Sequence, residues 1–230
     1  MFVMFSVLLN DVKADPYVDM IKDYYRKMEK ISSPTSKKVY HISYTEQIVS
    51  NEPGQSIKTN VNIYSSEDKF YYYTGLVDLF QDANDAFLIV HKEKMVYHTN
   101  SVENSKSKRQ FSSYLKIQEK FFETGKILLS EVVVLNGKKV ARVSIETPKE
   151  LDPRLKVVRT TYWFDIEAKK LIKTKVDFDS SYQIKSKVTE YNELNLNYKK
   201  KLKKAVFKKV IDKKGQLLEP YKSYKLVVNK

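Results

Sequence analysis

Histidine side chains are the first candidates for chemistry, because imidazole changes charge near neutral pH and is the commonest metal ligand. The chain has three, His41, His91 and His98, each in a stretch whose alternation is typical of a β-strand. His91 and His98 flank the short connection at residues 92–94, so a metal held across a hairpin is one interpretation. No third ligand follows at a suitable spacing. We therefore predict histidines at the edge of the core, with no metal and no cofactor.

Three aspartates raise the possibility of paired carboxylates, which glycoside hydrolysis uses. Asp165 ends one expected strand, and Asp177 and Asp179 end the next. Acids at such places commonly cap turns, which is the interpretation we favour. The chain has no cysteine, which excludes thiol nucleophiles, disulfides and a cysteine-linked lipid anchor. No GxGxxG, P-loop, GxSxG or HExxH pattern is present. We predict that the protein is not an enzyme, and keep a hydrolase with a cryptic carboxylate or histidine site as a third hypothesis.

The charge balance points to an anionic partner. Lysine and arginine number 42 against 28 acids, a formal net charge of +14, which suits nucleic acid, anionic lipid head groups or acidic proteins. No RRM, KH or OB signature appears, so we expect no nucleic acid. Near an anionic membrane each lysine contributes about 1 kcal/mol of attraction, although a solvated loop explains the same run. The candidates for membrane or anion contact are Lys199, Lys200, Lys201, Lys203 and Lys204.

The N-terminus has the features of a secretory signal. Met1–Leu9 is an unbroken apolar run of nine residues, the length of a signal core but far below the roughly 20 residues of a membrane span. Val12 and Ala14 suit the −3 and −1 positions of a cleavage site before Asp15. We predict a signal peptide at residues 1–14, and the missing basic segment before the run suggests that it is truncated. A short buried strand or helix is the alternative. Residues 15–230 are expected to form one domain in the periplasm.

Two helices are expected. Asp15 supplies an N-cap and Pro16 suits the first helical position, and apolar residues at helical spacing extend the first helix to Ile31. The spacing returns over Arg109–Thr124, where Gly125 is placed to end the second helix.

The remaining chain alternates with period two and is punctuated by turns, of which Asn136-Gly137 is the strongest hairpin signal. This pattern predicts about ten strands, including a last hairpin formed by Val206–Asp212 and Tyr221–Val228. An antiparallel sheet of that length tends to curl or close, and amphipathic helices can cover its concave face. The expected fold is mainly β (α+β), a curled antiparallel sheet forming a half-open barrel covered by two or three helices, with an apolar interior.

The order of these elements resembles the bacterial outer-membrane lipoprotein carrier (LolA-like) superfamily. A helix leads into a first strand over Asp15–Tyr44, and a charged-then-aromatic strand follows at Asp68–Tyr73. The closest likeness is the aromatic strand Thr161–Asp165 with the return strand after Lys169. The resemblance implies a concave apolar face that receives acyl chains beneath helices, and an arginine that holds the lid shut. Arg26 and Arg109 lie in no such motif, and the lysine-rich C-terminal region departs from the pattern.

The hypothesis from these patterns is a periplasmic lipid or lipoprotein carrier that shields acyl chains during transfer to the outer membrane. Its expected partners are acyl chains or lipoproteins, an anionic membrane surface and inner- and outer-membrane proteins, and the carrier itself is expected to be a monomer. The alternative is an envelope sensor or protein-interaction module of the same fold, whose cavity is filled by side chains. The candidate cavity residues are Ile21, Tyr25, Ile42, Tyr44, Val61, Ile63, Tyr72, Val143, Ile145, Tyr162, Phe164 and Val176.

Overall fold

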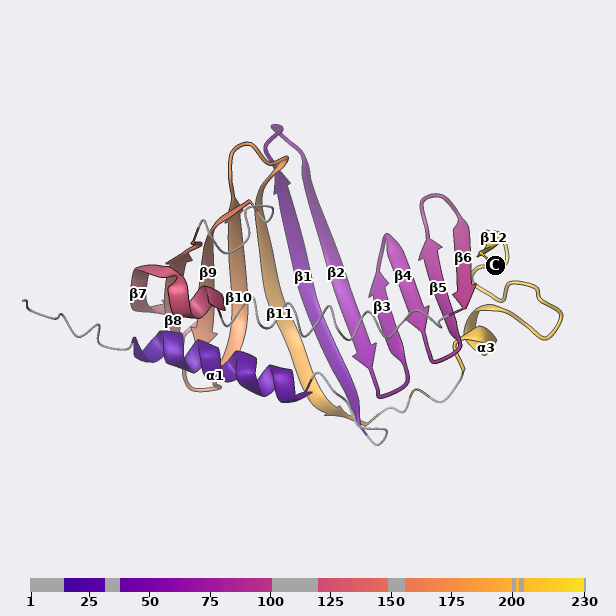
Figure 1. The fold of residues 1–230 in the computed structure, drawn as a ribbon, viewed down its shortest axis with the longest axis horizontal. Helices are drawn as coiled ribbons and strands as arrows, with labels where there is room; N and C mark the ends of the chain where they lie inside the picture. Colours follow the sequence, from indigo (N-terminus) through magenta and orange to yellow (C-terminus); the bar gives the residue numbers. More distant parts are fainter. Residues whose placement is uncertain are drawn as a thin grey trace, which may run out of the picture.

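One twelve-stranded sheet organises the computed structural model, which describes residues 15–31, 38–100, 120–148, 156–199, 202 and 205–229. The expected signal peptide and most of the expected second helix lie outside these residues. The strands follow the order β12-β6-β5-β4-β3-β2-β1-β11-β10-β9-β8-β7, so the sheet curls without closing (Figure 1). The mainly β, half-open fold is confirmed.

The elements are bounded as follows: α1 Pro16–Ile31, β1 Val39–Ser50, β2 Ser56–Ser65, β3 Phe70–Thr74, β4 Val77–Gln81, β5 Asp85–Val90, β6 Met95–Asn100, β7 Lys126–Leu135, β8 Lys138–Glu146, β9 Val157–Asp165, β10 Lys170–Phe178, β11 Ile184–Tyr198, α3 Phe207–Val210 and β12 Lys225–Asn229.

Helix α1 begins and ends where the sequence predicts. The backbone N–H groups of Tyr17 and Val18 donate to Asp15 Oδ1 at 2.9 and 3.1 Å, which satisfies two of the groups that a helix start leaves without partners. Val18 and Ile21 are buried against the sheet. The cap and the apolar stripe therefore fix the start of α1 and the side that it buries.

Two glycines set the geometry around β7. The Asn136-Gly137 turn has φ values of 51° and 76°, which confirms the expected hairpin between β7 and β8. At the other end, the Gly125 N–H donates to the Phe121 carbonyl at 2.8 Å. A Cβ at Gly125 would lie only 2.5 Å from Ile145 Cγ2, so only glycine lets the chain turn so close to β8.

Strand register divides the sheet into two faces. We call the side on which α1 packs the helix face, and the other side the opposite face. The helix face includes Val143, Tyr162 and Thr174, which pair with one another across β8, β9 and β10. Further along the sheet it includes Tyr44, Val61 and Thr74, which pair across β1, β2 and β3. Because side chains alternate along a strand, neighbours in sequence belong to different faces.

Two apolar cores lie on different faces of the sheet, one formed with α1 and the other with the C-terminal segment that contains α3. Figure 1 shows α1 and α3 towards different ends of the sheet. The α1 core is on the helix face and comprises Val18, Ile21, Phe121, Phe122, Ala141, Val143, Ile145, Tyr162, Phe164 and Leu171. The C-terminal core is on the opposite face and comprises Tyr71, Phe80, Phe87, Ile89, Val96, Val206, Val210, Ile211 and Tyr221. The segment that follows β11 thus covers the side of β3–β6 that faces away from α1.

The expected C-terminal hairpin is wrong. Its first half forms the short helix α3, and its second half forms β12, which pairs in parallel with β6. All other neighbouring strands pair antiparallel, as expected. The strand edge of β6 offers free backbone groups, and pairing with this edge replaces the local hairpin.

Strand β4 is absent from the sequence prediction. It lies between Gly75 and Asp82, and its second residue is the buried Asp78. Aspartate is depleted in strands and common in turns, so Asp78, followed closely by Asp82, Asn84 and Asp85, makes this short and otherwise mainly apolar strand hard to recognise. The partner of Asp78 explains its place: His91 Nε2 lies 3.1 Å from Asp78 Oδ2.

Candidate functional site

All ten strand positions in the predicted cavity share the helix face. Pairing links them in two groups, one around Tyr44 on β1–β3 and one around Tyr162 on β8–β10. The other two predicted residues, Ile21 and Tyr25, belong to α1, which lies on this face. The structure therefore brings the twelve candidates to one side of the sheet. Whether they bind a ligand remains a prediction.

The group under α1 is packed by the chain itself. Ile21, Val143, Ile145, Tyr162 and Phe164 are at most 2% exposed. Aromatic rings fill the remaining space, with the Tyr25 ring 5.7 Å from that of Phe122 and 6.3 Å from that of Tyr162, centre to centre. Burial also raises the pKa of Tyr24, at the same interface, to about 12. These side chains pack against one another as a core.

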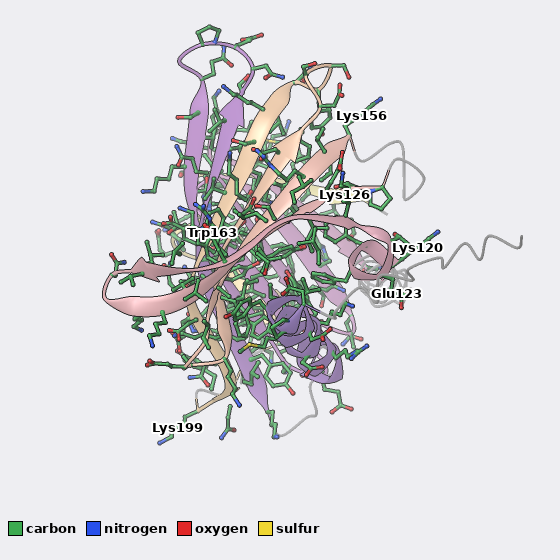
Figure 2. The ribbon with its side chains drawn as sticks, turned by 90° about the vertical axis from the view of Figure 1, so that its left-hand side faces the viewer. Lys120, Glu123, Lys126, Lys156, Trp163 and Lys199 are labelled. Carbon is green, nitrogen blue, oxygen red and sulfur yellow. The ribbon has the colours of Figure 1, made fainter. Side chains whose placement is uncertain are left out.

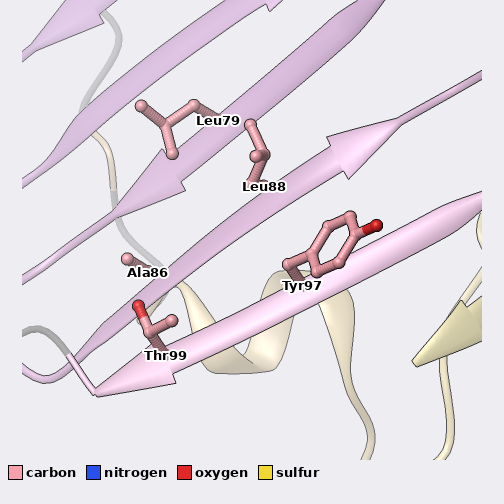
Figure 3. Close-up of a pocket in the computed structure, with 5 residues that line it drawn as sticks. All are labelled: Leu79, Ala86, Leu88, Tyr97 and Thr99. Carbon is pink, nitrogen blue, oxygen red and sulfur yellow. The ribbon is translucent and has the colours of Figure 1, made fainter. Parts of the chain in front are cut away.

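The group on β1–β3 is different, because α1 does not pack over it. Ile42, Tyr44, Ile63 and Tyr72 are partly exposed, and only Val61 is buried. The apolar surface continues beyond them into a pocket of about 300 Å³ on β4–β6, lined by Leu79, Ala86, Leu88, Tyr97 and Thr99 (Figure 3). We call the helix-face side chains of β1–β6 the open apolar face.

The sequence prediction missed the five residues that line this pocket. Leu79 belongs to the unrecognised strand β4, and it pairs with Leu88, which pairs with Tyr97. The alternation in β5 and β6 was visible, but each strand has large apolar side chains on both faces, such as Phe87 and Leu88 in β5 and Val96 and Tyr97 in β6. A buried strand with two apolar faces does not show which side is covered.

On β3–β6, the open apolar face and the C-terminal core lie on opposite sides of the same strands. Phe80, Phe87 and Ile89 are at most 1% exposed beneath the C-terminal segment, whereas Leu88, between two of them in sequence, is 40% exposed. On β4–β6, the described part of the chain therefore covers the opposite face and leaves the apolar surface of the helix face accessible.

Polar groups lie beside the apolar surface of β1–β3. Burial is the main reason that the pKa of Tyr44 and the pKa of Tyr72 are raised, and the Glu46 carboxylate raises both further. Lys187 Nζ lies 2.6 Å from Glu46 Oε2. Two neutral phenols and an ion pair therefore border the face and can exchange hydrogen bonds with a polar head group.

Each of the three histidines has a carboxylate partner. His91 Nε2 contacts Asp78, and its Nδ1 lies 3.1 Å from the Tyr224 hydroxyl, which ties the C-terminal segment to the sheet. His98 Nε2 lies 2.7 Å from Asp85 Oδ1. His41 Nδ1 lies 3.1 Å from Glu193 Oε2. Among the residues that the structure describes, no group of three or more histidine, cysteine or acidic side chains could hold a metal ion.

The three aspartates have structural partners. Arg159 and Lys175 contact the Asp177 carboxylate at 2.7 and 2.8 Å. Asp179 Oδ1 accepts the Ser181 N–H at 2.9 Å. Asp165 Oδ1 accepts the Ala168 N–H at 2.8 Å, and this bond is the main reason that the pKa of Asp165 is lowered. These contacts agree with turn caps and ion pairs.

Asp165→Asn is expected to lower the free energy of unfolding at pH 7 by roughly 1 kcal/mol, because the cap loses its charge. A lowered folded-state pKa contributes stability above the ordinary pKa of about 3.9, and that stability is lost as the pH falls through the folded-state value. The difference between the two proteins should therefore shrink towards pH 3. Urea unfolding at both pH values measures it, with Glu167→Gln, an exposed acid in the same turn, as control. A difference in the free energy of unfolding that stays the same at both pH values would contradict this role for the charge.

The lysine-rich run is only partly described. Lys199 is exposed just after β11, at the lower end of the strands in Figure 2. Lys200, Lys201, Lys203 and Lys204 lie outside the described residues, and their contact with an anionic surface stays a prediction. Within the described residues, no helix has both the length and the apolar character that a membrane crossing needs.

No family model matches the chain, and no curated protein matches it. Several solved structures are similar. An uncharacterised conserved protein from Thermus thermophilus has a TM-score of 0.44 at 6% identity, over 91% of this chain and 99% of the other. The lipoprotein LppX of Mycobacterium tuberculosis has a TM-score of 0.41 at 12% identity, over 79% and 97%. A LolA superfamily protein from Nitrosomonas europaea has a TM-score of 0.28 at 6% identity, over 76% and 94%. A LolA superfamily protein is among the solved structures that the chain is similar to, and the function is argued below from the chain's own residues.

Proposed function

We propose that the protein is an exported carrier that shields the acyl chains of a lipid or lipoprotein on its open apolar face. The observation that carries the proposal is the continuous apolar surface of β1–β6 with its pocket of about 300 Å³, on the side of the sheet away from the C-terminal core. The periplasm is the proposed compartment, and delivery to the outer membrane is the proposed task.

Acyl chains suit this surface because their burial needs no specific partner groups. Each methylene removed from water contributes about 0.8 kcal/mol, so a dozen of them supply about 10 kcal/mol before the costs of ordering are subtracted. A flat or shallow surface removes only part of each methylene from water, so the favourable free energy is smaller than this figure. Reversible transfer requires such intermediate binding.

The polar border gives the carrier a place for the head group. Tyr44 and Tyr72 are neutral across the physiological range, because a phenol ordinarily has a pKa of about 10 and burial raises the pKa of both further. Their hydroxyls and the Lys187 ammonium lie on the helix face beside the apolar residues of β1–β3. We infer that the head group lies towards Glu46 and Lys187 while the chains extend over β4–β6.

Leu88→Asp is expected to reduce lipid uptake at least tenfold, because it places a charge in the lining of the pocket. Leu88 is 40% exposed, so the fold should tolerate the change. The protein is purified from a bacterial periplasm, and native mass spectrometry with lipid extraction measures bound phospholipid or acylated peptide. Val228→Asp is the matched control: it is 54% exposed and lies on the opposite face at the same end of the sheet.

The outcomes separate two functions. Lipid bound by the wild type and the control but lost from Leu88→Asp supports the carrier. A wild-type protein that purifies without lipid and takes up none overturns it. The packed α1 core favours the second candidate in that case, a protein-interaction or sensor module whose interior is filled by side chains.

A further inference from the structure

Strand β7 exposes an unusual amount of apolar surface. Val134 is 74% exposed, and four more large apolar side chains of the same strand are at least 37% exposed: Ile127, Leu128, Val132 and Leu135. They lie on both sides of the strand, because the residues from Ser130 to Leu135 pair one by one with β8 and so alternate. This surface is separate from the open apolar face, at the far end of the sheet order.

The backbone of β7 has an unused edge. Within the described residues β7 pairs only with β8 and ends the sheet order. In an antiparallel pair, every second residue of an edge strand directs its N–H and C=O away from its partner, and these groups can pair with another strand. In Figure 2 β7 crosses the front of the molecule, with Lys126 near its start.

Edge strands usually carry features that prevent such pairing, and β7 has few of them. The other edge strand, β12, has five residues, whereas β7 has ten. Proteins protect long edges with proline and with lysine in the strand. From Ile127 to Leu135 there is no proline, and Glu131 is the single charged residue. An ion pair with Arg142 compensates that charge.

Charge decides which partner fits. Exposed Lys126 begins β7, and exposed Lys139 follows the turn at its other end. A second copy would bring the same lysines and a net charge of +14. We propose that β7 binds an extended peptide segment of another protein as an additional strand, apolar in its middle and acidic at both ends.

The test uses a displayed library of random 12-residue peptides, selected on the full chain and counter-selected on the Val134→Lys variant. Enriched peptides should alternate apolar residues in the middle and carry aspartate or glutamate at the ends. A labelled peptide of enriched sequence should bind at least tenfold more weakly to Val134→Lys and to Val132→Lys. Val228→Lys, on the other edge strand, should bind like the wild type. Both tested valines are exposed, so folding should be preserved, which circular dichroism checks.

Three results would overturn the proposal. One is a selection in which no peptide distinguishes the wild type from Val134→Lys. Another is enrichment of peptides without acidic ends. The third is self-association in sedimentation that Val134→Lys abolishes, which would make a second copy the occupant. None of these results depends on lipid uptake, because Val134 lies on β7, the edge strand, and Leu88 lies on β5, in the other half of the sheet order.

Discussion

Replacing Phe164 by alanine is expected to lower the free energy of unfolding by about 3–5 kcal/mol. Phe164 is 2% exposed and lies between Ala141 and Leu171 on the neighbouring strands. The Tyr24 ring packs edge-on against it, with ring centres 5.9 Å apart. The variant therefore leaves a cavity beneath α1 and loses one of the contacts that hold the helix on the sheet. Urea unfolding followed by circular dichroism gives the difference.

Two variants control this experiment. Phe164→Leu keeps an apolar side chain and should lose less than about 2 kcal/mol. Trp163→Ala removes a larger ring from the adjacent, partly exposed position on the opposite face, and should cost less than Phe164→Ala. Equal losses for Phe164→Ala and Trp163→Ala would mean that α1 does not depend on this part of the sheet.

Phe80→Ala should destabilise the protein by a similar amount, about 3–5 kcal/mol, through the other core. Phe80 is 1% exposed, and its ring centre lies 5.6 Å from that of Tyr71 and 5.3 Å from that of Tyr73. Lys209 Nζ lies 4.4 Å from the Phe80 ring centre, a cation–π contact that fixes the C-terminal segment. Hydrogen exchange should therefore show faster opening of residues 206–229 as well as the lower stability.

Leu79→Ala is the matched control, since Leu79 is adjacent in sequence but lies on the open apolar face. Leu79→Ala should mainly lower lipid uptake and change the free energy of unfolding little. Phe80→Ala should mainly lower the free energy of unfolding. The losses of Phe80→Ala and Phe164→Ala should also add to within about 0.5 kcal/mol in the double variant, because the two cores share no residue. A large non-additive term would contradict the separation of the two cores.

Local signals in the sequence were sufficient for the parts of the fold that depend on neighbouring residues. The Asp15 cap and the helical spacing locate α1, and Asn136-Gly137 locates the β7–β8 hairpin. Period-two alternation places residues such as Tyr44 and Tyr162 on one face. Each of these features depends on the conformational preferences of a few neighbouring residues, and the local sequence indicates those preferences directly.

The remainder depends on contacts between distant segments. Phe87 and Leu88 are equally apolar, and only the C-terminal segment makes one buried and the other accessible. The same segment forms β12 by pairing with β6, which no local pattern indicates. The predicted site residues share the helix face, but they include core residues such as Phe164 and do not include the pocket around Leu88. Whether this face binds a ligand stays a prediction.

The parallel pairing of β12 with β6 has a consequence for the order of assembly. Lys225 pairs with Met95, so the chain makes its last strand long after it has made the strand that receives it. Until then Phe80, Phe87 and Val96 have no cover on the opposite face, since their cover is the C-terminal segment itself. Because a chain is made from its N-terminus, this half of the sheet cannot be completed before residues 225–229 have been made. Contacts of such long sequence separation form late, which favours a loosely packed state of this half during synthesis.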